Sequence, residues 1–304
     1  DNDGYPDIAT VNYFNASVII YRHSADNANI SFSLAGYIPY GGLTAFPPSL
    51  PLAILATDVT GDGLDDLIIG GASPSVQLHI NLGGAFAPST AVVENGIVRH
   101  MVFGDVDGDG IDDIVFTLTP FTAGNETVHW VRLTGTSMEA TASLVGLITP
   151  APQFDYFYPS YATVAVADLN ADGHLDMVAS SPYTDKIMTF MTSGTPGAFL
   201  PPRPVAFGLL EPIRVIALDV NVDGLPDFAV LARTLGRIGQ TLHLNTPGAP
   251  GTFDPQPTIL DFPLADSGVG QWFEAGDVNG DGFDDLVIGA RCGDSSRGRD
   301  AGQA

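Results

Sequence analysis

The chain has 304 residues, of which 45% are hydrophobic and 15% charged, and its formal net charge is −24. This is the composition of a globular protein large enough for a sizeable core. The acidity argues against nucleic acid as a partner, because phosphate binding needs clustered Lys and Arg. The single cysteine, Cys292, excludes an internal disulfide, and no apolar run is long enough to span a bilayer.

An acidic nine-residue motif, D-x-[DN]-x-D-G-x-x-D, recurs along the chain. Its copies are residues 58–66, 105–113, 168–176, 219–227 and 277–285, and the chain begins inside a further copy at 1–7. Thr60 replaces Asp or Asn at the third position of one copy. The Asp before each motif Gly recurs at intervals of 59, 47, 63, 51 and 58 residues. This spacing predicts a repeat architecture, and because 22 of the 35 acidic residues lie in the motifs, the acidity is local.

Each period is predicted to hold four short strands, labelled A to D. In one period these are LAILATD (52–58), DLIIGG (66–71), VQLHINL (76–82) and FAPSTAVV (86–93), so the motif joins strands A and B. Strands A and B are apolar at nearly every position, which is typical of strands buried on both faces. An aromatic or Met residue is expected to open strand D, and these residues are Phe32, Phe86, Met138, Phe199 and Phe253.

The repeat predicts an all-β fold, a β-propeller of four-stranded antiparallel blades with the motifs as A–B hairpin loops. A β-sandwich would not repeat in this way, and a β-helix has a much shorter repeat. Five complete B-C-D-A periods and a final B strand indicate at least five blades. The copies at 1–7 and 277–285 would compete for one hairpin of a five-bladed ring, which favours a fragment of a seven-bladed ring. We expect the propeller to cover 1–290, with a disordered tail at 291–304.

The motif is predicted to bind Ca²⁺. Side chains at positions 1, 3 and 5 point into a tight turn, Gly at position 6 permits the bend, and the carbonyl at position 7 and the Asp at position 9 complete an oxygen cage. An Asp/Gly-rich turn without metal is the alternative. The loop is not an EF-hand, since position 12 is an apolar strand residue in every complete copy. The expected ligands are Asp1, Asp3 and Asp7; Asp58, Thr60, Asp62, Leu64 and Asp66; Asp105, Asp107, Asp109, Ile111 and Asp113; Asp168, Asn170, Asp172, His174 and Asp176; Asp219, Asn221, Asp223, Leu225 and Asp227; Asp277, Asn279, Asp281, Phe283 and Asp285.

These motifs resemble the FG-GAP/VCBS repeat family, which includes the integrin-α propeller and many bacterial secreted proteins. Phe103-Gly104 before one motif and GGASP (70–74) after another carry the family spelling, and NTPGAPGTF (245–253) is similar to a Gly-rich turn of bacterial members. Most periods depart from the full spelling, so the bacterial branch is the closer likeness. The resemblance implies a calcium-stabilised propeller, commonly seven-bladed, on an extracellular or cell-surface protein.

The sequence predicts a recognition or adhesion module rather than an enzyme. The His residues are scattered, no nucleophile elbow occurs, and the motif spacing explains the carboxylates better than a glycosidase pair does. A protein or glycan partner is expected on the face opposite the calcium loops, where exposed tyrosines, Tyr156, Tyr158 and Tyr161, are candidate contacts. A carbohydrate-binding lectin and an accessory domain of a secreted polysaccharide-active enzyme are the alternatives.

Overall fold

The protein is described here by a computed structural model. It describes residues 1, 3–24, 30–41, 50–72, 74–87, 90–92, 96–121, 124–135, 138, 143–151, 162–182, 185–206, 212–234, 237–254, 258–260, 272–280 and 283–289. This described part contains 21 strands. That number equals five periods of four strands and one further strand, as the sequence predicts. No helix of this part is long and apolar enough to cross a membrane.

The first half of the chain contains eleven antiparallel strands, which form a three-stranded and an eight-stranded sheet. A three-stranded sheet has the order β1 (Ile8–Asn12), β2 (Ser17–His23), β3 (Phe32–Pro39). The next strands are β4 (Leu50–Thr57), β5 (Asp66–Ala72), β6 (Val76–His79) and β7 (Thr90–Val92), paired in chain order. They are followed by β8 (Gly96–Gly104), β9 (Asp113–Pro120), β10 (Gly124–Val131) and β11 (Ser143–Ala151), also paired in chain order. One residue pair between β5 and β8, Ala72 with Ile97, joins these two sets into an eight-stranded sheet.

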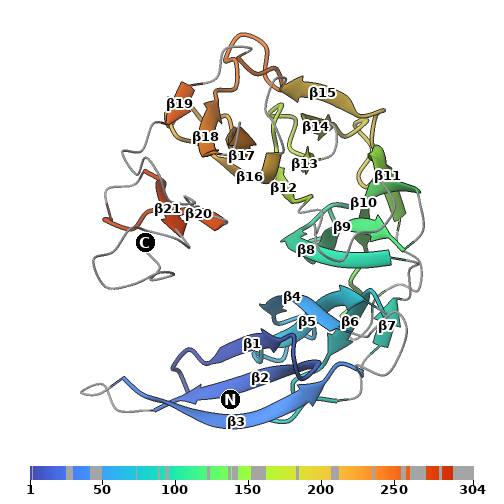
Figure 1. Cartoon of the computed structure of the whole chain (residues 1–304), viewed down its shortest axis with the longest axis vertical. Coiled ribbons are helices and arrows are strands. Elements are labelled where there is room, and N and C mark those ends of the chain that lie inside the picture. The colour runs from blue at the N-terminus through green and yellow to red at the C-terminus, as the bar shows by residue number, and fades with distance from the viewer. Residues whose placement is uncertain are drawn as a thin grey trace. The chain divides into compact units, whose positions relative to one another are not determined.

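The second half contains two separate four-stranded sheets and a hairpin (Figure 1). One sheet has the order β12 (Val164–Ala167), β13 (Asp176–Ser181), β14 (Lys186–Phe190), β15 (Arg203–Ala206). The other, orange in Figure 1, has the order β16 (Pro212–Leu218), β17 (Asp227–Thr234), β18 (Arg237–His243), β19 (Thr258–Leu260). The hairpin pairs β20 (Trp272–Gly276) with β21 (Asp285–Gly289). Four consecutive antiparallel strands therefore form the structural unit of the chain.

The chain divides into two compact units. One consists of Asp1–Asp105, Asp109–Ala123 and His129–Leu144, and the other of Val106–Gly108, Gly124–Val128 and Val145–Ala304. Within each unit the core lies between the faces of successive sheets. In the first unit, for example, Ile68 of β5 packs with Val98 of β8 and Phe116 of β9. In the second, Val178 of β13 packs with Val215 of β16 and Val230 of β17.

The second strand of each four-stranded set is the most deeply buried. Every residue of β5 and of β13 is buried, and Phe228 to Ala232 of β17 are buried as well. Both faces of such a strand contact neighbouring sheets, which explains why the B segments are apolar without alternation. The prediction of doubly buried B strands is thus confirmed.

The aromatic landmark differs from its predicted position. Phe32 does begin β3, but Phe86, Met138, Phe199 and Phe253 each form an isolated bridge with the residue two positions after strand C. The bridge closes the turn between strands C and D, and strand D starts several residues later. These side chains therefore clamp the turn; Phe253, for instance, packs edge-to-face on Phe228 with ring centroids 4.5 Å apart.

Candidate functional site

Every complete motif lies in the same place, in the hairpin between the first two strands of a sheet. The residue before motif position 1 pairs with the Asp at position 9, as in Thr57 with Asp66 and Ala167 with Asp176. Position 9 is also the first residue of β5, β9, β13, β17 and β21. The register thus places positions 1 to 8 outside the ladder, where their polar groups are available to one another.

The Asp at position 1 is held by the backbone of its own turn. In four loops its two carboxylate oxygens accept the amide N–H groups of positions 5 and 6, at distances of 2.7 to 3.1 Å. These acceptors are Asp58, Asp105, Asp168 and Asp219. The backbone hydrogen bonds, that from Gly63 first, lower the pKa of Asp58. A carboxylate fixed by amides in this way is ionised and pre-oriented before any cation arrives.

The turn is built from two residues in the left-handed region. Glycine at position 6 has φ near +85°, for example +87° at Gly110 and +84° at Gly224, which confirms the predicted role of this glycine. Position 4 is left-handed too, and the sequence reasoning missed it because only some copies have glycine there. Ala171 has φ of 59° and Val222 has φ of 55°, a conformation that a β-branched residue rarely adopts.

The Asp at position 5 caps the end of the same turn. Its side chain accepts the N–H of position 7 at 2.9 Å in five loops, with Asp3, Asp62, Asp109, Asp172 and Asp223 as acceptors. The donors in the last four loops are Leu64, Ile111, His174 and Leu225, the residues whose carbonyls the sequence nominates as ligands. Their N–H groups point into the turn, and they carry the chain onward to strand B.

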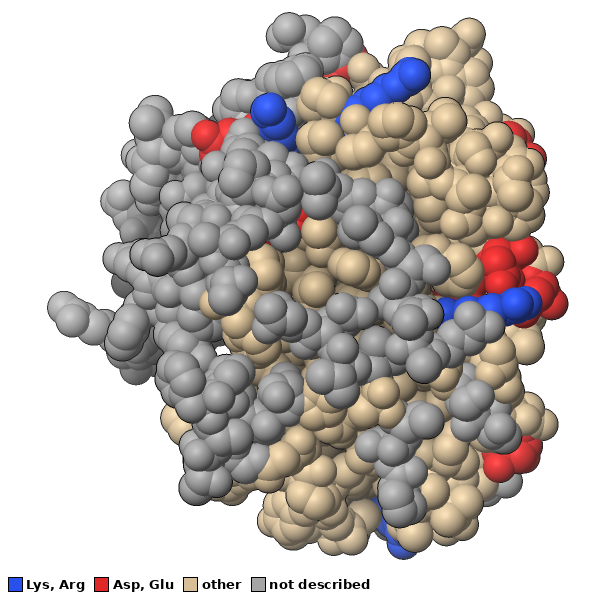
Figure 2. Space-filling view, turned by 90° about the vertical axis from the view of Figure 1, so that its right-hand side faces the viewer, with Lys and Arg blue, Asp and Glu red and all other residues tan. Residues whose placement is uncertain are grey.

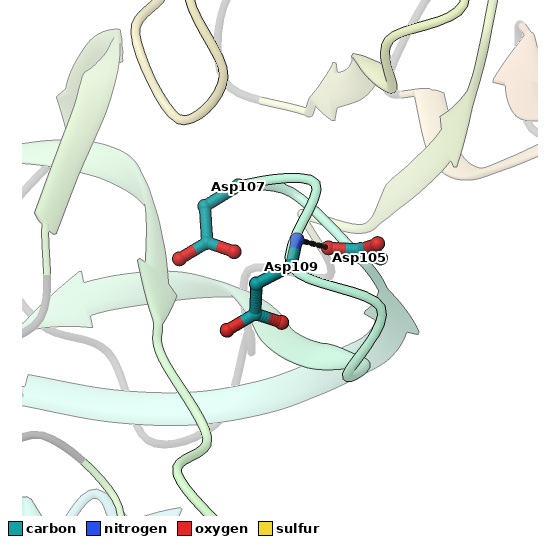
Figure 3. A group of neighbouring side chains, drawn as sticks. All are labelled: Asp105, Asp107 and Asp109. Carbon is teal, nitrogen blue, oxygen red and sulfur yellow. Dashed lines mark hydrogen bonds between the residues drawn. The ribbon is translucent and has the colours of Figure 1, made fainter.

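Loop 105–113 brings three carboxylates together (Figure 3). One carboxylate oxygen from each of Asp105, Asp107 and Asp109 lies within 4.8 Å of the others. Arg132 of the loop after β10 places its Nη2 2.6 Å from Asp109 Oδ2, and this contact lowers the pKa of Asp109. A set of three carboxylate oxygens on a tight loop is hard-ligand chemistry that fits Ca²⁺ better than a transition metal.

Three other loops replace the position-3 carboxylate by an amide, and the hydrogen bonds of two of these amides are described. Asn170 and Asn221 at position 3 donate through Nδ2 to the position-5 carboxylates of Asp172 and Asp223, each at 3.0 Å. Their Oδ1 atoms accept the N–H of the same position-5 residues. Positions 3 and 5 are therefore adjacent in these loops as well, and rotation of the amide would turn its oxygen toward a cation.

The Asp at position 9 has a different environment from the other motif carboxylates. Asp66, Asp113, Asp176 and Asp227 are fully buried. One oxygen accepts the N–H of position 2, as Asp66 does from Val59 and Asp176 from Leu169. The other accepts the N–H of the residue two positions after strand C, and these donors are Asn81, Leu133, Thr192 and Asn245. Position 9 thus ties the motif loop to strand C.

Burial dominates the electrostatics of position 9. It raises the pKa of Asp66, Asp176 and Asp227, and the hydrogen bonds from the backbone oppose that shift. The sequence nominates these residues as cation ligands. The structure gives them a role that the sequence reasoning missed, because the donors just beyond strand C lie 15 to 20 residues away. The signal that could have revealed it is the Asn two positions after two of the C strands, Asn81 and Asn245.

The remaining copies are partial or substituted. At 58–66, the Thr60 hydroxyl donates to Asp58 at 3.3 Å and thus lies beside the position-1 carboxylate. In the first copy, Asp7 accepts the N–H of His23 at 2.9 Å, and the Asp1 carboxylate lies 3.1 Å from Arg22 Nε. In the last copy, Asp277 accepts from Gly280 and Asp285 from Val278, while Asn279 and Phe283 lie in the same loop. Asp281 lies outside the described residues, as do Tyr156, Tyr158 and Tyr161.

The described acidic side chains on one face of the protein can be followed in Figure 2. On the face shown in Figure 2, Asp and Glu occur in small separate groups, and a basic side chain lies against one of them. This distribution agrees with an acidity that is carried by individual loops, as the 22 motif carboxylates indicate. Each loop therefore presents its own local negative potential.

Comparisons with known proteins identify the repeat. Residues 58–116 match the FG-GAP-like repeat and residues 269–304 match the FG-GAP repeat, so the second match extends through the predicted tail. No curated protein matches the chain. Among solved structures, a lectin of Agrocybe aegerita, described as recognising non-reducing terminal N-acetylglucosamine, matches with a TM-score of 0.61 and 18% identity, covering 99% of this chain and 77% of that one. At this identity the likeness concerns the fold.

Proposed function

From the premise that the chain carries FG-GAP repeats folded as β-propeller blades, we propose that it is a calcium-binding recognition module of a secreted or cell-surface protein, without catalytic activity of its own. The observation that carries the calcium part is the convergence of Asp105, Asp107 and Asp109 in one loop. Five further copies of the loop hold the same kinds of oxygen donors at matching positions.

The residues present fit a hard divalent cation. In loop 105–113 the three clustered carboxylates would hold the ion, and the other loops would use their position-1 and position-5 Asp with Asn170, Asn221 or Thr60 between them. Bound calcium supplies charge neutralisation where carboxylates otherwise repel one another. The position-1 Asp residues are oriented by turn amides, so the loop is shaped before binding.

The calcium proposal is tested by calorimetric titration of the metal-free protein with CaCl₂ and by thermal melting with and without EDTA. A ligand bound only by the folded state stabilises it, so we expect EDTA to lower the melting temperature clearly. The variant Asp107→Ala should bind one calcium fewer than the unmodified protein. Asp112→Ala is the matched control, because Asp112 is an exposed carboxylate of the same loop outside the cluster. Equal calcium stoichiometry in the two variants would contradict the assignment.

We further propose that the recognised partner is a glycan. The likeness of the fold to a lectin that recognises terminal N-acetylglucosamine favours this partner over a protein. An array of neutral and sialylated oligosaccharides, probed with labelled protein in calcium and in EDTA, tests the proposal. Calcium-dependent binding to a defined subset of glycans is expected. An array without signal, together with capture of a protein partner through the same module, would replace the glycan by a protein ligand.

A further inference from the structure

Two copies of the motif hold an arginine against one of their carboxylates. Arg132 Nη2 lies 2.6 Å from Asp109 Oδ2 in loop 105–113, and Arg22 Nε lies 3.1 Å from Asp1 Oδ2 in the first copy. Asp109 is at motif position 5 and Asp1 at position 3, so each arginine faces a carboxylate of the outer turn. The two ion pairs belong to different sheets and are independent observations of one arrangement.

The two arginines occupy the same backbone position. In each sheet the position-9 carboxylate accepts the N–H of a residue at or just beyond the end of strand C, and the arginine directly precedes that donor. The donor is His23 after Arg22, and it is Leu133 after Arg132. The hydrogen bond to position 9 therefore fixes the chain so that the preceding side chain reaches the outer turn of the motif.

The corresponding position is apolar in three other sheets. It holds Ile80, Met191 and Leu244, and each of these residues is followed by the donor to the position-9 Asp. Their carbonyls each accept an N–H from the far side of the turn after strand C, so the three residues share one backbone geometry. The side chains of Ile80 and Met191 pack against hydrophobic clusters. The motif loops are thus of two kinds, with and without an arginine at this position.

Arg132 engages the carboxylate oxygen that two other loops leave to a movable amide. Asp109 Oδ1 accepts the N–H of Ile111 at 2.9 Å, and its Oδ2 faces the guanidinium of Arg132. In two loops without arginine the equivalent Oδ2 atoms, those of Asp172 and Asp223, accept from the amide at position 3, each at 3.0 Å. A neutral amide can rotate and offer its own oxygen, whereas a guanidinium has donors only and keeps its charge.

We propose that an arginine at this position is a tethered cation that competes with calcium, and that Arg132 does so in loop 105–113, an inference that rests on the proposed calcium binding. The guanidinium neutralises the clustered carboxylates while no metal is bound. It must leave Asp109 Oδ2 before a divalent cation uses that oxygen, because two cations at one carboxylate oxygen repel each other. Loops 168–176 and 219–227, which lack the arginine, are therefore expected to fill at lower calcium concentrations.

Solvent exposure keeps this competition moderate. The Arg132 side chain is 38% exposed and that of Asp109 is 25% exposed. Water screens an ion pair in such a place, so the pair is weak enough to open when calcium arrives. Removal of the arginine is therefore expected to lower the Kd of loop 105–113 for calcium by about three- to tenfold, and not by several orders of magnitude.

Calorimetric titration of the whole chain with CaCl₂ tests the proposal. Arg132→Met introduces the residue that another sheet has at this position, Met191, and should tighten calcium binding at one loop by about three- to tenfold. Arg132→Gln, a second neutral variant, should act in the same way, whereas Arg132→Lys keeps the charge and should keep the competition. The gain should vanish in the double variant with Asp107→Ala, which removes a ligand of the same loop.

Thermal melting in EDTA gives a readout that does not involve bound metal. Arg132→Met should melt about 1–3 °C below the unmodified protein, because the carboxylates lose their neutralising charge. Arg203→Met is the matched control. Arg203 is exposed on β15, and among the described residues no ion pair holds its side chain. This variant should change neither the calcium affinity nor the melting temperature in EDTA.

Leu244→Arg is the reciprocal variant. Leu244 precedes the donor to Asp227 as Arg132 precedes the donor to Asp113, and it is only partly buried. An arginine introduced there should weaken calcium binding by loop 219–227 by about three- to tenfold. Melting curves in calcium should show that every variant folds.

The outcomes separate the role of the arginine from calcium binding itself. If the unmodified protein binds calcium and Arg132→Met leaves each Kd unchanged, the arginine does not compete, although calcium binding stands. If Arg203→Met tightens binding equally, or the gain persists beside Asp107→Ala, the effect comes from the net charge or from another loop, and the proposal is overturned. If neither the unmodified protein nor any variant binds calcium, the proposed function fails and the inference with it.

Discussion

The outer and inner parts of each motif hairpin differ in what their carboxylates do. Positions 1 to 5 lie on the outer turn, where Asp105, Asp107 and Asp109 converge with Asp109 exposed and the other two partly buried. Position 9, represented by Asp176, is fully buried, and its oxygens accept N–H groups from the loop and from strand C. Under the calcium proposal, the same residue type at one spacing therefore serves two purposes, cation binding outside and architecture inside. Solvent exposure and the available donors decide between them.

The largest expected effect on stability comes from removing the buried carboxylate at position 9. Asp176→Ala leaves the buried N–H groups of Leu169 and Thr192 without their acceptor, and each unsatisfied group costs about 1–3 kcal/mol. We expect a loss of about 4 kcal/mol in the free energy of unfolding, measured by urea denaturation in EDTA. Asp172→Ala in the same loop is the control, because Asp172 is exposed. Equal destabilisation by both variants would remove the distinction between the two parts.

The second largest effect is the stabilisation by calcium, which depends on the carboxylates at positions 1, 3 and 5. Saturating calcium at a hundredfold excess over Kd should stabilise the protein by about 2.7 kcal/mol for each site that only the folded state binds. Asp107→Ala should lose this increment for one loop, yet in EDTA it should melt at or above the temperature of the unmodified protein, since one repelling carboxylate is gone. Paired melting curves in calcium and in EDTA measure both quantities. A lower melting temperature in EDTA would assign Asp107 to the architecture.

The buried side chains next to position 9 also predict that the stability of the fold depends on pH. His243 stacks on Phe228 with ring centroids 4.6 Å apart, and burial lowers its pKa to about 4 against the opposing influence of Asp254. In the unfolded chain the pKa is about 6.5, so between these values only the unfolded state binds the proton. The contribution of neutral His243 to the free energy of unfolding is therefore fully present above pH 6.5. The free energy of unfolding then falls by about 2 kcal/mol as the pH is lowered to 5.

A neighbouring sheet supplies the variant that tests this dependence. Phe190 pairs with Met177 as His243 pairs with Phe228, so phenylalanine fits the corresponding place on strand C. His243→Phe should take up one proton fewer on unfolding between pH 6.5 and 5. This number is measured from the slope of the free energy of unfolding against pH. A slope identical to that of the unmodified protein would show that His243 titrates normally in the folded state.

The smallest effect concerns the turn that separates the two parts. Val222 is held at φ of 55° and is 54% exposed, so Val222→Gly removes backbone strain and loses little burial. We expect a gain of about 1 kcal/mol in the free energy of unfolding, at the lower end of the cost of a left-handed non-glycine residue. Gly224→Val, at the left-handed position 6 of the same loop, should have the opposite sign. Thermal melting in EDTA compares the two.

The sequence predicts the features that depend on local pattern. The strand order, the place of each motif between strands A and B, the burial of B strands and the glycine bend at position 6 all follow from spacing and hydrophobicity, and the structure agrees. The convergence of positions 1, 3 and 5 belongs to the same class, because these side chains share one short turn.

The features that the sequence did not reveal depend on partners far along the chain. The second role of Asp227 needs the N–H of Asn245, and Asp109 meets Arg132 across a hairpin. The left-handed backbone at position 4 has no signal in the sequence where alanine or valine occupies that position.

The buried Asp at position 9 frees the outer turn to vary. Since the hairpin is anchored to the turn after strand C, we expect a change such as Thr60 at position 3 to alter the proposed cation affinity while the blade keeps its shape. If the six loops bind calcium as proposed, they can therefore span a range of dissociation constants on one scaffold. Such a chain would fill its loops in succession as calcium rises, and it would respond over a broader concentration interval than six identical loops would allow.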